Sequence, residues 1–180
     1  MTDLTAVPDP IVEAAAYQRF LLDALGADDP GDVQAGTVGE VRALLEEAGG
    51  HLRARPAPGE WSVLGCLGHL VDAEIVMSAR YRFVVAQDEP PLVGYDQALW
   101  VERLDHEHDD PAALLALFET LRTANVAMWR RSTPQQRSRV GQHAERGPES
   151  YDLAYRMIGG HDRVHLAQAR RALEAVRGTA

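Results

Sequence analysis

The sequence predicts an all-α protein that folds as a four-helix bundle, with one long crossover connection and an extra N-terminal helix packed outside. Three observations support this fold class. Apolar residues recur every three or four positions along several long segments, which is the spacing of one helix face. Residues that cap helices stand just before these segments. The chain shows no convincing set of strands and no sequence repeat, and a long connection suits a crossover bundle.

Two helices are expected before the first proline-rich loop. An Asp-Pro pair at 9–10 is a typical helix start, and we expect the extra helix to cover about residues 10–25. Thr37 is followed three positions later by Glu40, a spacing that predicts a capping box at the start of the first bundle helix. The glycine pair at 49–50 should interrupt or end that helix.

The second bundle helix follows the loop RPAPGEWS. Ser62 can cap it, and its apolar stripe reaches Ala86. Residues 87–110 then form a connection that is too long for a simple turn. We expect a short helix near Gln97–Leu104 within this connection, which makes it the crossover of the bundle.

The third and fourth bundle helices occupy the rest of the chain. A second Asp-Pro pair, at 110–111, predicts the start of the third helix, and Pro134 closes it. The segment RVGQHAERGPES, residues 139–150, is expected to be irregular or a short hairpin. The last helix should run from about Tyr151 to Val176.

Composition limits the classes of function. The 180 residues carry a formal net charge of −9, which disfavours binding to nucleic acids or to anionic membranes. All 18 basic residues are arginine, so neither a Schiff-base lysine nor a P-loop lysine is available. The single cysteine, Cys66, excludes an intramolecular disulfide. The first residues do not resemble a signal peptide, and no apolar run is long enough to span a bilayer. We therefore expect a cytoplasmic protein.

Three histidines form the most informative pattern. His161 and His165 are four residues apart, so they lie about 40° apart around a helix and could share a metal ion. Gln168 follows on the same stripe. His69 lies within the second bundle helix among mostly small residues, which would leave space for a ligand. From the residues alone, a chance pair and an ordinary hydrogen-bonded core histidine are alternatives.

Two distant motifs together resemble one known family. The stretch RPAPGEWSVLGCLGHL, followed by GGHDRVHLAQ, is similar to the DinB/YfiT-like family of small bacterial metal-binding proteins. The proline of the first motif directly precedes its glycine here, which is a departure in spacing. The resemblance covers about Thr37 to Val176. The matching positions are Pro58, Gly59, Trp61, Ser62 and His69 in the first motif, and His161, Asp162, His165 and Gln168 in the second.

The resemblance implies a single domain, residues 1–180, whose core of about residues 37–177 is an up-down-down-up bundle. It also implies that His69, His161 and His165 bind one divalent metal ion, zinc or nickel first and iron next. Such an ion could activate a low-molecular-weight thiol in a transferase or isomerase that acts on a small molecule. The alternatives are a metal-dependent hydrolase and a non-catalytic, stress-related binding module. A homodimer is compatible with the family.

Five further residues are candidates for the surroundings of the metal. Asp72 and Asp162 could orient the ligands, or they could be solvated surface carboxylates. Gln168 could donate to a bound ligand or pair with a helix neighbour. His143 could lie at the mouth of the site or be an ordinary loop residue. Cys66 could be a fourth ligand, a reactive thiol or a small buried apolar side chain.

Three other features have two interpretations each. The stretch HEHDD, residues 106–110, could be a metal cluster, but we expect a solvated acidic loop. Trp61 could stack on a substrate, but we expect it to fasten the helix start to the core. The glycines at 159–160 could let another helix or a ligand approach closely, or they could mark a kink.

Overall fold

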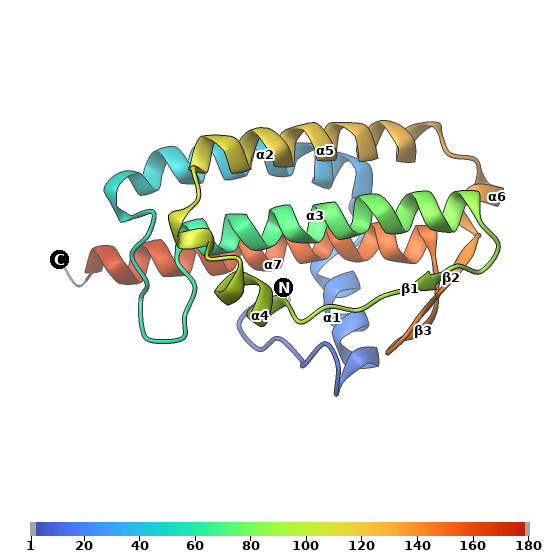
Figure 1. Ribbon diagram of the computed structural model, residues 1–180, viewed down its shortest axis with the longest axis horizontal. Coiled ribbons are helices and arrows are strands. Elements are labelled where there is room, and N and C mark those ends of the chain that lie inside the picture. Colours follow the sequence, from blue (N-terminus) through green and yellow to red (C-terminus); the bar gives the residue numbers. More distant parts are fainter. Residues whose placement is uncertain (1–2, 179–180) are drawn as a thin grey trace.

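Four long helices form the bundle that the sequence predicts, in a computed structural model that describes residues 3–178 (Figure 1). In Figure 1, α2 and α7 run in one direction and α3 and α5 in the other, which is the up-down-down-up order. Because α3 and α5 are parallel neighbours, the chain needs the long crossover between them. The helices are α2 (Pro30–Ala48), α3 (Val63–Ala86), α5 (Pro111–Arg131) and α7 (Tyr151–Gly178).

The first bundle helix starts earlier than predicted. It begins at Pro30, and the Asp29 side chain accepts hydrogen bonds from the backbone N–H groups of Gly31 and Asp32. This Asp-Pro pair is the same signal that starts α5 at Pro111, and proline suits the first turn because it has no N–H to leave unpaired. Thr37 therefore does not cap the helix but lies buried inside it. Gly49, with φ of 51°, ends α2 as predicted.

The extra helix α1 (Ala14–Leu25) packs on the outside of the bundle against α7 (Figure 1). Asp9 does cap this segment, since its carboxylate accepts from the backbone N–H groups of Ile11 and Val12. Residues 10–13 form turns, however, and the regular helix starts only at Ala14.

The crossover and the connection after α5 hold most of the short elements. The crossover contains the short helix α4 (Gln97–Arg103), close to its predicted range. A small sheet with the order β1-β2-β3, whose strand β1 was not predicted, lies beside the bundle. Its strands have two to four residues, too few for an alternating pattern to show in the sequence. The other elements are η1 (Gly49–His51), β1 (Pro91–Leu92), η2 (His106–His108), α6 (Pro134–Arg137), β2 (Val140–His143) and β3 (Gly147–Ser150).

The sheet joins the crossover to the segment before α7. Strands β2 and β3 form the antiparallel hairpin that was one of the two expectations for residues 139–150. Strand β1 of the crossover pairs in parallel with β2, with Leu92 opposite His143. This pairing holds the first part of the crossover against the end of the bundle where α7 begins (Figure 1). Within residues 3–178, no helix combines the length and the apolar character that crossing a membrane requires.

Candidate metal centre

The three predicted histidines converge between α3 and α7. One ring nitrogen from each of His69, His161 and His165 lies within 4.8 Å of the other two. The Nε2 atoms of His69 and His161 are 2.9 Å apart. The three residues are only 0%, 5% and 6% exposed, respectively. Two positions one turn apart on α7 and one position within the neighbouring helix α3 thus bring all three imidazoles together.

Burial keeps these imidazoles neutral. It lowers the pKa of His69 and His161 well below 6.5, and the neighbouring histidines lower both further. Burial also lowers the pKa of His165 to about 4, although its hydrogen bond to Gln168 acts in the opposite direction. Neutral imidazoles offer the lone pairs that metal ions bind.

Gln168 fixes the orientation of one imidazole. Its side-chain Oε1 lies 2.8 Å from His165 Nδ1. Because an amide oxygen can only accept, His165 donates from Nδ1 and its Nε2 keeps a free lone pair. Of the two interpretations of Gln168, this contact supports the pairing with a helix neighbour.

The donor set fits a divalent ion. Nitrogens that share a zinc-sized ion at about 2.1 Å each are at most about 4.2 Å apart. In the tetrahedral arrangement that zinc prefers, they are about 3.4 Å apart, so the ring nitrogens, which lie within 4.8 Å of one another, would move closer together on binding an ion. The Nδ1 atoms of His69 and His161 are buried without a hydrogen-bond partner among the described residues. Three such ligands leave at least one coordination position open.

Trp61 lies directly against the triad, at the start of α3. Its ring is 5.0 Å from that of His69 and is stacked on that of His165 at 5.8 Å. Trp61 also packs on the apolar cluster near Val63, as expected for a residue that fastens the helix start. It therefore shields the imidazoles from one side in addition to fastening the helix.

Asp162 is neither a surface carboxylate nor a hydrogen-bond partner of the ligands. It is 1% exposed and forms an ion pair with the fully buried Arg122, which also pairs with Glu74. The Thr37 hydroxyl donates to Asp162 as well. Burial disfavours the charge of Arg122, but the two carboxylates outweigh this effect and raise its pKa. The network thus places compensated charges in the bundle core, next to His161 in the sequence.

Asp72 is not a solvated carboxylate, and the first histidine of the stretch HEHDD does not lie in a solvated loop, because both side chains are buried. His106 is buried and bridges Asp72 and Asp109, at 2.8 Å and 2.7 Å. Burial opposes the charge of His106, but the two carboxylates outweigh it and raise its pKa. The ring packs on Gly68, where a Cβ would lie 2.3 Å from His106 Cγ. Asp72 therefore anchors the crossover to α3 and does not touch the triad.

Cys66 lies outside the triad. It is 1% exposed and packs in an apolar cluster with Leu44, Ala169 and Leu173. Burial raises the pKa of its thiol to about 12, with only a small opposing effect from Arg171. A protonated thiol among aliphatic side chains is a poor ligand and a poor nucleophile. Of the three interpretations, this environment supports the small buried apolar residue.

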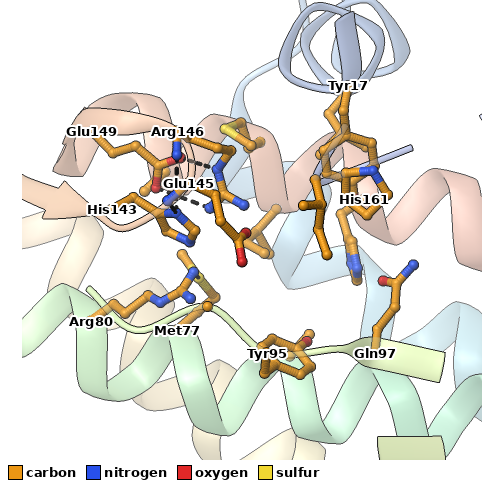
Figure 2. Close-up of a pocket in the computed structure, with 18 residues that line it drawn as sticks. Tyr17, Met77, Arg80, Tyr95, Gln97, His143, Glu145, Arg146, Glu149 and His161 are labelled. Atoms are coloured by element: carbon orange, nitrogen blue, oxygen red, sulfur yellow. Dashed lines mark hydrogen bonds and ion pairs between the residues drawn. The ribbon is translucent and has the colours of Figure 1, made fainter. Parts of the chain in front are cut away.

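Two openings are each lined by one histidine of the triad. The first, here called the His161 pocket, lies between α1, α3, α7 and the hairpin and is lined by Tyr17, Met77, Arg80, His143 and His161 among others (Figure 2). The second, here called the Trp61 cleft, is lined by Trp61, His165, Gln168 and Arg171 among others. Gln97 of α4 lines both openings. The His161 pocket therefore reaches one histidine of the triad, and the Trp61 cleft reaches another.

Of the remaining candidates, His143 proves to line the pocket. It lies at the end of β2, is 3% exposed, and faces the His161 pocket (Figure 2). Arg80 of α3 also lines this pocket, but it was not among the residues predicted from the sequence. A signal was available, because 80 is eleven positions after 69 and so lies only about 20° from it around a helix. Arg80 and His69 therefore share one face of α3.

Comparison with known proteins assigns the chain to a family. The model of the DinB superfamily matches residues 34–169. This chain belongs to the DinB superfamily. The match spans α2 to α7 and includes all three histidines of the triad.

Named relatives and a solved structure extend the comparison. "Putative metal-dependent hydrolase YfiT" of Bacillus subtilis is 30% identical over 87 residues, 48% of this chain and 49% of that protein. A "Putative metal-dependent hydrolase" of Oceanobacillus iheyensis is 26% identical over 109 residues, 61% of this chain. The chain thus spans about half the length of the first relative and 63% of the second.

The fold agrees over nearly the whole chain. The structure titled "YfiT from Bacillus subtilis is a probable metal-dependent hydrolase with an unusual four-helix bundle topology" has a TM-score of 0.73 at 20% identity. It covers 98% of this chain and 97% of that one. This similarity shows that the whole architecture, α1 included, is shared.

Proposed function

We propose that this DinB-superfamily protein is a metal-dependent enzyme in which His69, His161 and His165 bind one divalent ion. The observation that carries the proposal is the convergence of three buried, neutral imidazoles, of which His161 lines one opening and His165 another. A structural site would be closed by a fourth protein ligand, and within residues 3–178 no cysteine or carboxylate joins this group.

For the reaction, we propose thiol-dependent transfer or isomerisation of a small molecule. A bound divalent ion supplies Lewis acidity, which favours the deprotonated form of a thiol or a water molecule. The two openings support a reaction with two organic partners, one in the His161 pocket and one in the Trp61 cleft. Gln97, which lines both spaces, could contact both partners.

Hydrolysis is the second candidate. The printed names of the B. subtilis and O. iheyensis relatives favour it. A hydrolase needs one organic substrate and water, so only one of the two openings would be used for binding. The protein ligands would be the same for both reactions, and only turnover can separate them.

A paired turnover assay tests these reactions. We expect the zinc- or nickel-loaded protein to conjugate 1-chloro-2,4-dinitrobenzene with bacillithiol or mycothiol, the thiol sulfur replacing chloride. Cleavage of p-nitrophenyl acetate without thiol should stay at the background rate. Loss of the metal should lower the conjugation rate by about 100-fold or more, which equals ~2.7 kcal/mol.

Two variants control this assay. His165→Ala should lose the activity, whereas His108→Ala should keep it, because His108 is exposed and pairs only with Asp105. Ester cleavage that needs the metal and no thiol would contradict thiol-dependent transfer and support hydrolysis. If neither reaction depends on the metal, the proposed enzymatic role is wrong for these substrates.

A further inference from the structure

Arg80 is a buried arginine without a counter-ion. Its side chain on α3 is 8% exposed. One guanidinium nitrogen donates to the backbone oxygen of Val93, and the other terminal nitrogen lies 3.7 Å from Met77 Sδ. Its Nε is buried and has no hydrogen-bond partner among the residues that the structure describes. Among residues 3–178, no carboxylate is in ion-pair contact with Arg80, unlike the buried Arg122.

A buried charge of this kind is costly. Burial lowers the pKa of Arg80, and the nearby Arg146 lowers it further. Arg146 is itself neutralised, because it forms an ion pair with the buried Glu149. Folded proteins rarely bury a charge without pairing it. The pocket wall also carries the carboxylates of Glu145 and Glu149, and Glu149 acts to raise the pKa of Arg80. Because Glu149 is paired with Arg146, and no carboxylate among residues 3–178 is in ion-pair contact with Arg80, the Arg80 guanidinium is a donor that an anionic ligand could match.

His143 adds a second unmatched donor beside Arg80. Its Nδ1 accepts from the backbone N–H groups of Glu145 and Arg146, at 3.2 Å and 3.4 Å. Burial lowers the pKa of His143 to about 4, and Arg146 contributes to the shift. The neutral ring must then carry its proton on Nε2. This Nε2 is buried without a hydrogen-bond partner in the described part of the chain, and Figure 2 shows the ring directed toward Arg80.

The rest of the pocket suits an apolar body. Its walls between Arg80 and His161 carry mostly aliphatic and aromatic side chains, among them Ile11, Tyr17, Leu21, Met77, Met157 and Ile158. One cation and one neutral donor match a singly charged carboxylate better than a dianion. Eleven positions separate Arg80 from His69, a rise of about 16 Å along α3. His161 of the triad lines the same pocket as Arg80, which leaves room between them for a body of several carbon atoms (Figure 2).

We propose that the His161 pocket binds a small organic carboxylate whose oxygens accept hydrogen bonds from Arg80 and His143. The apolar body of this molecule extends along α3 toward the histidine triad. The inference deepens the proposed function, because it names the substrate class of the same site. It rests on that function only for the reacting end of the molecule, since the carboxylate subsite contains none of the three histidines.

Binding of hexanoate, compared with its neutral analogue hexanamide, tests the proposal. We expect isothermal titration calorimetry to show hexanoate binding to both the metal-loaded and the chelator-stripped protein. Arg80→Met should weaken hexanoate binding at least tenfold and leave hexanamide binding unchanged. Arg130→Met, at an exposed arginine paired with Asp32, should change neither. His143→Phe should weaken hexanoate binding by a smaller factor.

The stability of Arg80→Met provides a second measurement. Because no carboxylate among residues 3–178 pairs with Arg80, the melting temperature of Arg80→Met without hexanoate should equal or exceed that of the unmodified protein without hexanoate. Hexanoate should raise the melting temperature of the unmodified protein and not that of the variant.

Three outcomes would overturn the proposal. These are equal hexanoate affinity in Arg80→Met, binding only when metal is present, and no binding at millimolar hexanoate. Metal content, measured on the same samples, separates the two proposals. Arg80-dependent binding in a protein that takes up no metal would support the carboxylate subsite and contradict the metal-dependent function.

Discussion

Replacing Arg122 by methionine will destabilise the protein by about 3–5 kcal/mol, the cost of breaking a buried ion pair from one side. Arg122 is 2% exposed and neutralises Glu74 and Asp162, which are each 1% exposed. Without the guanidinium, two carboxylates stay in the core with no opposite charge, although Asn125 still donates to Glu74. Urea denaturation followed by circular dichroism gives the free energy of unfolding directly.

Two other arginines supply the controls. Arg130→Met removes an exposed ion pair and should cost no more than about 0.5 kcal/mol. Arg80→Met removes a buried arginine without a counter-ion and should not destabilise the protein. If Arg122→Met costs as little as Arg130→Met, the buried network does not contribute as the structure indicates.

Gly160→Ala will detach or displace α1. A Cβ at Gly160 would lie 1.8 Å from the backbone oxygen of Leu21 and 2.7 Å from its carbonyl carbon. Backbone cannot rotate away as a side chain can, so α1 must shift. Overpacking of this kind costs about 1–3 kcal/mol and more where backbone has to move. Tyr17 and Leu21 of α1 line the His161 pocket, so ligand binding there should weaken as well.

Gly159→Ala is the matched control. A Cβ at Gly159 would lie 2.9 Å from Leu25 Cδ1, the end of a flexible side chain, and 3.8 Å from the Cα atom of Pro30. Alanine favours a helix by about 1 kcal/mol over glycine, so this variant should be close to neutral in unfolding experiments. Equal stability of the two variants would show that the glycines are not required for the approach of α1.

The sequence predicted most helix boundaries because caps are local signals. Ser62 and the Asp-Pro pair at 110–111 cap α3 and α5 as expected. The start of α2 was misplaced because two local signals competed, a capping box at Thr37 and an Asp-Pro pair at 29–30. The structure shows that the pair with proline decides the boundary.

The histidine triad was predictable for a related reason. The spacing of His161 and His165 on one helix is itself local information, and the first motif supplied His69. The contacts of Asp72 and Asp162 were not predictable, because their partners, His106 and Arg122, are 34 and 40 positions away. A carboxylate that is paired in the core looks the same in a sequence as one in solvent.

The central claim is that His69, His161 and His165 bind one divalent ion, and it is tested most directly by measuring the metal. Inductively coupled plasma mass spectrometry on protein purified without chelators, with X-ray absorption at the metal edge, measures the amount of metal and its ligands. We predict about one divalent ion per chain, bound by three imidazole nitrogens with at least one open position. It should be lost in His165→Ala and retained in His108→Ala. A folded protein without stoichiometric metal, whose stability does not change when all three histidines are replaced, would contradict the account.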